Sequence, residues 1–257
     1  IIPSLLIHQN GLIKTKNFNI NNAKYVGDPL NAVRIFNEKK ADELIISDIQ
    51  ATIENKDPNY DLISKIAAEC RMPLCYAGGI KNLEQIEKII SLGVEKVGLG
   101  SACINNPELI SHAAKRVGSQ SIVAIMDVKK YGLFNNYKVF THNGKKQSNY
   151  SPFEFLDKFQ SLGAGEIIIN SIDNDGKMKG YDLKLIDSLY SHAIAPLTIS
   201  GGAGSIKDME NILITAKMNK LNLPLSKIIR NMYKQLSKKG YNNLDHSYLF
   251  KEIKNYF

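Results

Sequence analysis

The sequence has no apolar run long enough to cross a bilayer and no secretory signal pattern. A membrane-spanning helix needs about 18 or more consecutive apolar residues, so we expect none here. The chain begins at Ile1 rather than at methionine, and we expect a few residues to precede it. Nothing in its first residues resembles the charged and apolar regions of a signal peptide. These absences predict a cytoplasmic protein that has no membrane partner.

Cysteine is scarce, and its three occurrences lack the spacing of a known site. Cys70, Cys75 and Cys103 form neither a CxxC pair nor a metal-binding pattern. An odd number of cysteines in an intracellular chain indicates reduced thiols rather than a disulfide framework. A nucleophilic cysteine would need a histidine partner, and no histidine lies in a motif with one. We therefore expect mostly buried structural thiols, no bound metal and no cofactor.

The net charge of +8 is concentrated in the last fifth of the chain. From Ile206 onward there are ten Lys and Arg residues and four acidic ones, so this part carries 10 − 4 = +6 and the rest only +2. A basic surface can bind nucleic acid, but these residues are scattered along expected helical faces without an aromatic stacking pattern. Solvated helix surfaces are the better interpretation, and we expect no nucleic-acid partner.

Short apolar runs alternate with amphipathic segments, which is typical of repeated βα units around a parallel sheet. A helix is expected over residues 83–92, where Ile86, Ile89 and Ile90 recur at helical spacing. No GxGxxG motif follows the first strand, so a dinucleotide-binding fold has little support. The length suits an α/β fold of the TIM type, a (β/α) barrel of roughly 250 residues. The seven expected strands cover residues 1–7, 43–48, 73–77, 96–101, 121–127, 166–171 and 197–201.

The sequence repeats itself at an offset of 123 residues. Residues 42–48 resemble residues 165–171, and residues 73–79 resemble residues 196–202. Apolar strands can match by chance, but two matches at one offset with the same ending indicate two fused half-barrels. We therefore expect residues 1–205 to form one barrel domain built from two repeats.

Glycine and small polar residues cluster where the predicted strands end. In a (β/α) barrel this end is the reactive face, and backbone N–H groups of such glycines bind anions together with the N-terminus of the following helix. A lone glycine pair would indicate only a tight turn. Two Gly-Gly pairs half a barrel apart favour two phosphate sites for an elongated substrate. The candidate residues are Gly78, Gly79, Gly100, Ser101, Asp175, Gly176, Ser200, Gly201, Gly202 and Ala203.

Several motifs in residues 1–205 resemble the cyclase subunit of imidazole glycerol phosphate synthase, the HisF family. They include Ala77-Gly-Gly-Ile, Asp127-Val-Lys-Lys, Phe140-Thr-His-Asn-Gly-Lys-Lys, Asn170-Ser-Ile-Asp-Asn-Asp-Gly and Ser200-Gly-Gly-Ala-Gly. The resemblance implies a barrel whose mouth binds a phosphorylated small molecule, the bisphosphate substrate. It also implies a heterodimer in which a glutaminase docks at the opposite end and sends ammonia through the barrel.

The resemblance assigns further residues to these two ends. It implies that Lys14, in the loop after the first strand, contacts the substrate, although a lone lysine there is otherwise simply solvated. Glu43, Lys96 and Glu166 match the charged ring that gates the ammonia tunnel in the family. Without the resemblance, these three charges would be read as ion pairs that serve stability alone.

The expected catalytic pair of the family is incomplete in this chain. Enzymes of this family catalyse a ring closure with two aspartates. One lies at the end of the first strand and the other at the end of the fifth. The fifth-strand position is Asp127, but the first-strand position is Leu6, which cannot transfer a proton. Residues 2–15 resemble a subgroup of HisF-like proteins tied to acetamidino modification of bacterial surface sugars. In that subgroup, the resemblance implies, ammonia is supplied to a separate sugar amidotransferase.

Three functions follow from this pattern. The first is a cyclase-like subunit that receives ammonia from a glutaminase for the amidination of a bacterial surface sugar. The second is the imidazole glycerol phosphate synthase cyclase, a lyase of histidine biosynthesis, which Leu6 disfavours. The third is an inactive fusion or chimeric chain that only binds partners.

Residues 206–257 do not continue the barrel pattern. The eighth strand should lie near residues 218–228, where Pro224 and the helical spacing of Leu225, Ile228 and Ile229 predict a helix instead. This part resembles the helical C-terminal end of β-hydroxyacid dehydrogenases, and the resemblance makes Lys207 the counterpart of a lysine near the nicotinamide. Hydride transfer is not expected, because the dinucleotide-binding domain is missing.

The expected replacement of the eighth strand has structural consequences. A seven-strand barrel leaves the first and seventh strands with open edges. It also lacks the eighth-strand loop that usually completes a phosphate site with the loop after strand seven. We therefore predict weak phosphate binding by residues 201–204.

Overall fold

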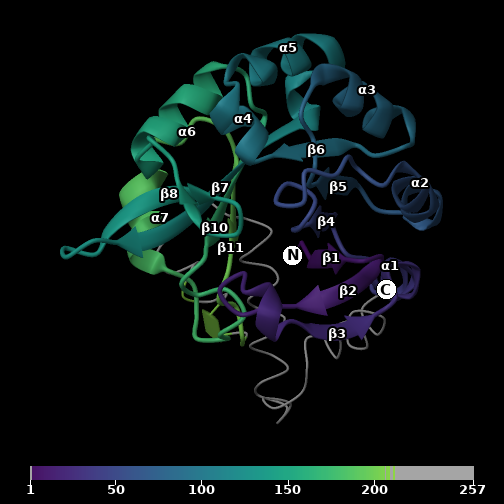
Figure 1. Ribbon diagram of the computed structural model, residues 1–257, viewed down its shortest axis with the longest axis horizontal. Coiled ribbons are helices and arrows are strands. Elements are labelled where there is room, and N and C mark those ends of the chain that lie inside the picture. Colours follow the sequence, from purple (N-terminus) through teal and green to yellow (C-terminus); the bar gives the residue numbers. More distant parts are fainter. Residues whose placement is uncertain (1, 206, 209–210, 212–257) are drawn as a thin grey trace, which may run out of the picture.

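The computed structural model describes residues 2–205, 207–208 and 211 (Figure 1). Its centre is one curved sheet with seven parallel strands, and the helices lie on the outside of the curve. All seven strands expected from the sequence are present, with ends that differ by a few residues. In chain order they are β1 (Ser4–His8), β4 (Leu44–Asp48), β5 (Leu74–Ala77), β6 (Lys96–Leu99), β7 (Ile122–Tyr131), β10 (Glu166–Ser171) and β11 (Leu197–Ser200).

The helices between these strands complete the βα units and confirm the TIM-type α/β architecture. The helix predicted over residues 83–92 is α3 (Leu83–Ser91), whose Ile86 and Ile89 are fully buried. Its first turn is capped by the Asn82 side chain, which accepts a hydrogen bond from the backbone N–H of Gln85. The other helices are α1 (Pro29–Glu38), α2 (Tyr60–Glu69), α4 (Ser101–Asn105), α5 (Glu108–Val117), α6 (Pro152–Ser161) and α7 (Leu183–Tyr190).

Two antiparallel extensions were not expected from the sequence. The chain turns after β1 into β2 (Gly11–Lys14) and β3 (Lys24–Gly27), and the end of β7 pairs with β8 (Asn136–Thr141), which pairs with β9 (Lys146–Gln147). Both extensions grow from the carboxyl ends of parallel strands. They therefore build walls around the reactive end of the barrel.

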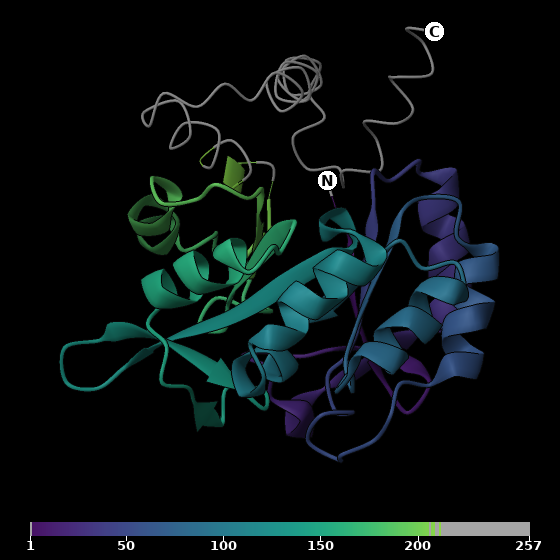
Figure 2. The same ribbon diagram turned by 90° about the horizontal axis from the view of Figure 1, so that it is seen from above.

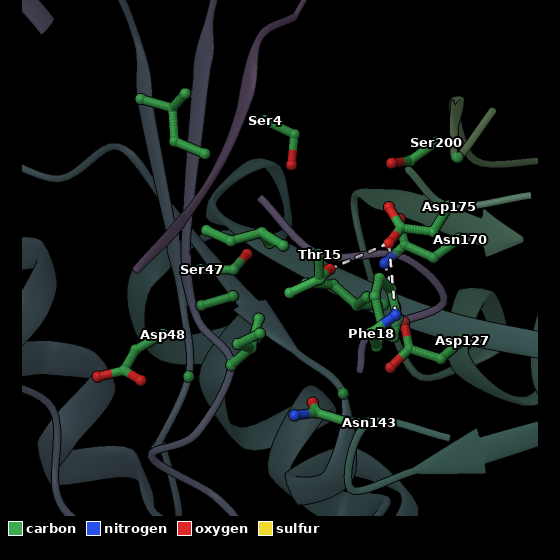
Figure 3. Close-up of a pocket in the computed structure, with 18 of the residues that line it drawn as sticks. Ser4, Thr15, Phe18, Ser47, Asp48, Asp127, Asn143, Asn170, Asp175 and Ser200 are labelled. Atoms are coloured by element: carbon green, nitrogen blue, oxygen red, sulfur yellow. Dashed lines mark hydrogen bonds between the residues drawn. The ribbon is translucent and has the colours of Figure 1, made fainter. Parts of the chain in front are cut away.

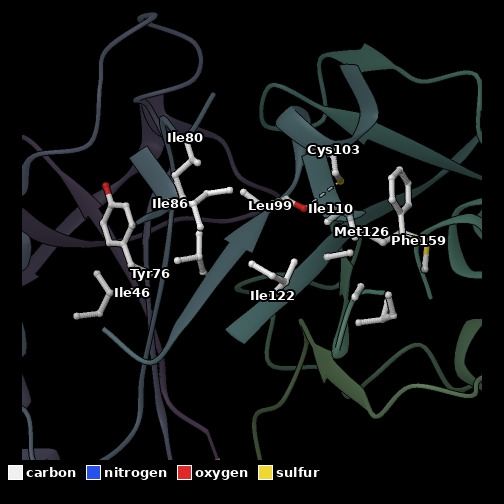
Figure 4. Packing of buried hydrophobic residues seen from close by; sticks show 14 of the residues in the cluster. Ile46, Tyr76, Ile80, Ile86, Leu99, Cys103, Ile110, Ile122, Met126 and Phe159 are labelled. Atoms are coloured by element: carbon white, nitrogen blue, oxygen red, sulfur yellow. Dashed lines mark hydrogen bonds between the residues drawn. The ribbon is translucent and has the colours of Figure 1, made fainter. Parts of the chain in front are cut away.

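Side chains on the parallel strands alternate between two apolar layers, as the period of two residues requires. Those that point outward pack beneath the helices, and Figure 4 shows Ile46, Ile122 and Met126 in this layer. Those that point inward form a separate small cluster of Ile45, Cys75, Val123 and Ile168. The inner cluster lies part-way along the strands, between their two ends.

Two glycine turns that are 123 residues apart have the same geometry. Gly78 has a φ of +118°, and a Cβ added there would lie 2.3 Å from the carbonyl oxygen of Asp48. Gly201 has a φ of +94°, and its Cβ would lie 2.6 Å from the carbonyl oxygen of Ser171. Gly78 and Gly201 are 123 residues apart, and so are Asp48 and Ser171. The same close approach of two strand ends therefore occurs twice, once in each half of the described sheet. Only glycine tolerates both the positive φ and the contact.

The curved sheet remains open between its first and last parallel strands. Within the described residues β11 pairs only with β10, and a cavity of about 470 Å³ lies between β11 and β1. The expectation of a fully open first strand is wrong, because Leu6, Ile7 and His8 pair with β2. The hairpin thus covers part of the edge that an eighth strand would take. The predicted helical tail, residues 206–257, lies outside the described residues except at 207–208 and 211.

Among the helices of the described part of the chain, none combines the length and the apolar character that a bilayer crossing requires. Within the same residues, no three His, Cys, Asp or Glu side chains are grouped so that they could hold a metal ion.

Candidate functional site

The carboxyl ends of the seven parallel strands surround a cavity of about 480 Å³ (Figure 3). The predicted mouth residues converge on it from all parts of the sequence. Gly79 is the exception, because it does not line the cavity and its backbone lies against Ala51 and the carbonyl of Lys56. The predicted residues that line it are Leu6, Lys14, Gly78, Gly100, Ser101, Asp127, Asp175, Gly176, Ser200, Gly201, Gly202 and Ala203.

Asp127 is the carboxylate best placed for proton transfer. It lies on β7 and its Oδ1 accepts a hydrogen bond of 2.9 Å from the side-chain amide of Asn170 on β10. Burial raises the pKa of Asp127 to about 6, and the hydrogen bond from Asn170 opposes this shift only in part. A carboxyl group with a pKa near the working pH can both take up and release a proton.

The raised pKa of Asp127 predicts a pH-dependent effect on stability. We expect Asp127→Asn to raise the free energy of unfolding at pH 8 by about 3 kcal/mol, and by much less near pH 4. The folded state favours the protonated carboxyl, so the contribution of Asp127 to stability is fully present below the unfolded pKa and is lost as the pH rises through about 6. Denaturant unfolding at both pH values measures the difference. An equal change at both values would contradict the assignment.

Leu6 occupies the position on β1 that Asp127 occupies on β7. Leu6 lies beside Ser47 of β4 in the strand register, and Asp127 lies beside Asn170 of β10. Ser47 and Asn170 are 123 residues apart, so the two pairs are equivalent in the repeat. The structure therefore places the apolar side chain of Leu6 where a second carboxylate would face Asp127.

The wall of the cavity near β2 is held by Asp175. Its Oδ2 accepts hydrogen bonds from the Thr15 hydroxyl at 3.2 Å and from the Phe18 backbone N–H at 3.4 Å. Burial raises the pKa of Asp175, while these hydrogen bonds oppose the shift. Lys14 lies on the same wall with its ammonium group 3.7 Å from the sulfur of Met178. It contributes a positive charge at the rim of the mouth.

The glycine-rich turn after β11 already holds an anion from the chain itself. The Asp208 carboxylate accepts hydrogen bonds from the backbone N–H groups of Gly204 at 3.0 Å and Ser205 at 2.8 Å. The Ser205 hydroxyl donates a further hydrogen bond of 2.9 Å to the same carboxylate oxygen. Gly201, Gly202 and Ala203 remain at the cavity wall. Because the N–H groups of Gly204 and Ser205 are already bonded to Asp208, this half of the mouth has fewer backbone donors left for an anion.

The three predicted gate residues meet at the opposite end of the barrel. The ammonium group of Lys96 lies 2.7 Å from Glu43 and 2.8 Å from Glu166, and Thr198 donates a hydrogen bond to Glu166. Burial raises the pKa of Glu43, against the effect of Lys96. Burial lowers the pKa of Lys96, but the hydrogen bonds to Glu166 and Glu43 outweigh it and the pKa is raised. Lys96 therefore stays charged and bridges two carboxylates.

The inner apolar cluster lies between the predicted gate residues and the cavity at the carboxyl ends of the strands, and the cavity between β11 and β1 runs beside it. Along β10 the inward-pointing residues are Glu166 at the gate, Ile168 in the cluster and Asn170 at the mouth. Cys75 belongs to the same layer, and its complete burial raises the thiol pKa far above its usual range. Cys103 is also buried and Cys70 is half-buried, and all three are free thiols. The prediction of mostly buried structural cysteines is confirmed.

Sequence reasoning missed several polar side chains of the cavity wall, namely Thr15, Ser47, Asp48, His142, Asn143 and Asn170. His142 and Asn143 have positive φ values of 54° and 57°, a conformation that costs energy in residues other than glycine. The side-chain Nδ2 of Asn143 is buried without a hydrogen-bond partner. Such a donor is suited to an acceptor on a ligand. The strained turn was invisible in the sequence because neither residue is glycine.

Comparisons with known proteins agree with this geometry. The family model described as "Histidine biosynthesis protein" matches residues 1–221. An imidazole glycerol phosphate synthase subunit HisF of Dehalococcoides mccartyi is 37% identical over 213 residues, which cover 83% of each chain. The chain belongs to the HisF family. Other relatives of this HisF-family protein are more similar in sequence.

Two of these relatives carry provisional names as HisF subunits of imidazole glycerol phosphate synthase. The protein of Leptospira interrogans is 52% identical over 213 residues and covers 83% of each chain. The protein of Pseudomonas aeruginosa is 48% identical over 209 residues, 81% of this chain and 82% of the relative. The family match covers all seven parallel strands of the described structure, while residues 222–257 lie beyond the matched range.

Proposed function

We propose that this HisF-family chain is a cyclase-like synthase subunit that receives ammonia from a glutaminase. In this proposal the glutaminase docks at the gate end, and ammonia crosses the apolar interior to the mouth. The observation that carries the proposal is the bridge from Lys96 to Glu43 and Glu166, at the end of the barrel opposite the cavity. A charged cluster over an apolar interior suits a passage that excludes water and ions and admits a small neutral molecule.

The residues at the mouth favour a phosphorylated substrate. Gly78 and Gly201 place bare backbone on opposite sides of the cavity, and Lys14 adds a positive charge at the rim. Backbone N–H groups and lysine are the usual partners of phosphate oxygens in such barrels. Because Asp208 occupies two donors of the turn after β11, we expect that site to bind phosphate weakly.

We further propose that the ammonia serves the amidination of a bacterial surface sugar through a separate amidotransferase. The support is Leu6, which leaves Asp127 without the opposing carboxylate that acid–base ring closure would use. Delivery of ammonia needs a docking face and an apolar passage but no such pair. The resemblance of residues 2–15 to the acetamidino-sugar subgroup points in the same direction.

The histidine-pathway cyclase is the second candidate. It is favoured by the half-buried Asp127 with its pKa of about 6 and by the names of the relatives. A steady-state assay with the bisphosphate substrate and ammonium separates the two functions. We expect no ring-closed product from the natural chain. Turnover at a rate typical of the relatives would establish the cyclase instead.

The main test is the effect on a glutaminase. Adding the purified chain to the purified glutaminase encoded in the same genome is expected to raise glutamate release by about 5–150-fold, the usual range for coupling between distant sites. The measurement is the initial rate of glutamate formation from glutamine. An inactive fusion that only binds partners would leave the rate unchanged, and that result would reject the proposal.

A further inference from the structure

The hairpin of β7 and β8 carries two large apolar side chains at its tip. Leu133 is 97% exposed and Phe134 is 86% exposed. They are the central residues of a turn closed by a hydrogen bond of 3.1 Å from the N–H of Asn135 to the carbonyl of Gly132. Turn positions of this kind are usually polar or glycine. Here they hold side chains that the hairpin itself cannot bury.

Side-chain contacts at the base of the hairpin hold its tip in place. Tyr131 packs edge-on against Phe140 with ring centroids 5.8 Å apart. The Tyr137 hydroxyl donates a hydrogen bond of 2.7 Å to Asp182, and the Lys130 ammonium group lies 3.2 Å from the same carboxylate. These contacts tie the hairpin to the start of α7. An anchor that is already ordered loses little conformational freedom when it binds.

The hairpin itself adds positive charge beside the tip. Residues 128–141 contain three lysines, at positions 129, 130 and 138, and no aspartate or glutamate, and Lys130 is paired with Asp182. Such a surface repels a second copy of itself and attracts carboxylates. Exposed apolar side chains surrounded by lysines therefore fit an apolar pocket with an acidic rim on another protein.

The hairpin leaves the barrel at the mouth end. Asp127 lies on β7 at the cavity wall, and His142 and Asn143 line the same cavity just after β8. Figure 2 shows the hairpin projecting sideways from the body of the molecule. A protein that grips the tip would lie beside the mouth and leave the gate end of the barrel free.

We propose that the tip, Leu133 and Phe134 with the neighbouring lysines, docks the enzyme that uses the ammonia, through an apolar pocket rimmed by carboxylates. This inference rests on the proposed function, because it requires a second enzyme at the mouth. It assigns separate surfaces to the two partners, the gate end to the glutaminase and the hairpin to the acceptor enzyme.

The test uses the purified sugar amidotransferase encoded in the same genome, immobilised for biolayer interferometry. We expect the double variant Leu133→Ser and Phe134→Ser to weaken its binding at least about 30-fold, as loss of a central apolar anchor does. Ile194→Ser is the matched control, because Ile194 is 88% exposed just before β11, at the gate end. We expect it to leave binding unchanged. Raising the salt concentration should weaken binding of the natural chain.

Other results would overturn the docking proposal. The proposal fails if the amidotransferase does not bind, or if the double variant binds it as tightly as the natural chain does. It also fails if the tip binds something else in place of the amidotransferase, namely phosphatidylglycerol–phosphatidylcholine vesicles, single-stranded RNA or a second copy of the chain. Glutamate release is measured in parallel with the same variants. Full stimulation without amidotransferase binding rejects only the docking site, whereas no stimulation by the natural chain rejects the proposed function itself.

Discussion

Lys96→Met is expected to lower the free energy of unfolding by about 3 kcal/mol and to abolish the stimulation of the glutaminase. The lysine side chain is 24% exposed, whereas the side chains of Glu43 and Glu166 are only 12% and 9% exposed. Removing the cation leaves two largely buried carboxylates that repel each other. Denaturant unfolding gives the stability change, and the rate of glutamate formation gives the coupling.

Two further variants separate the structural effect from the functional one. Lys115→Met removes an exposed lysine of α5 and is expected to change stability by less than about 0.5 kcal/mol. Replacing all three gate residues together, Lys96→Met with Glu43→Gln and Glu166→Gln, should recover most of the stability because no unpaired charge remains. We expect coupling to stay lost in the triple variant. If coupling returned with stability, the three charges would be structural ion pairs and not a gate.

Gly78→Ala and Gly201→Ala are each expected to lower the free energy of unfolding by roughly 2–4 kcal/mol. The added methyl group would lie 2.3 Å from the Asp48 carbonyl oxygen in one variant and 2.6 Å from the Ser171 carbonyl oxygen in the other. Each variant also forces alanine into a backbone conformation that it rarely adopts. Thermal or denaturant unfolding measures the loss of stability, and calorimetry with inorganic phosphate measures anion binding by the variants.

Gly132→Ala is the matched control for the two glycine variants. Gly132 also has a positive φ, +78°, but an added Cβ would meet nothing within 4 Å. It should therefore cost only the backbone strain, about 1–2 kcal/mol. A loss in Gly78→Ala and Gly201→Ala no larger than in Gly132→Ala would show that the close approach of the strand ends does not matter.

The parallel strands were predictable because burial on both faces leaves a continuous apolar run. Residues 166–171 are an example, since the predicted strand and β10 coincide. The prediction for β7 ended at Asp127, but the strand continues to Tyr131. Beyond Val128 the strand leaves β10 and pairs only with β8, so Lys130 and Tyr131 are exposed and the apolar pattern stops. The hairpins were missed for the same physical reason.

The site was predictable where backbone geometry demands a particular residue. Gly78 and Gly201 could be found because the turn excludes any side chain, and the offset of 123 residues linked them. Asn143 could not be found, because its importance lies in a strained turn and an unpaired amide that appear only in three dimensions. Ser47 likewise becomes informative only when the strand register places it beside Leu6.

In the proposed function, the two ends of one ring of strands do different work. Hydrogen–deuterium exchange of the chain with and without the purified glutaminase tests it most directly. We predict slower exchange in the loops that enter the strands at the gate, residues 39–43, 93–95 and 163–165, and no change around Gly78 and Gly201. Slower exchange at the glycine turns, with unchanged exchange in the gate loops, would place the glutaminase at the mouth end. That result would contradict the proposed function.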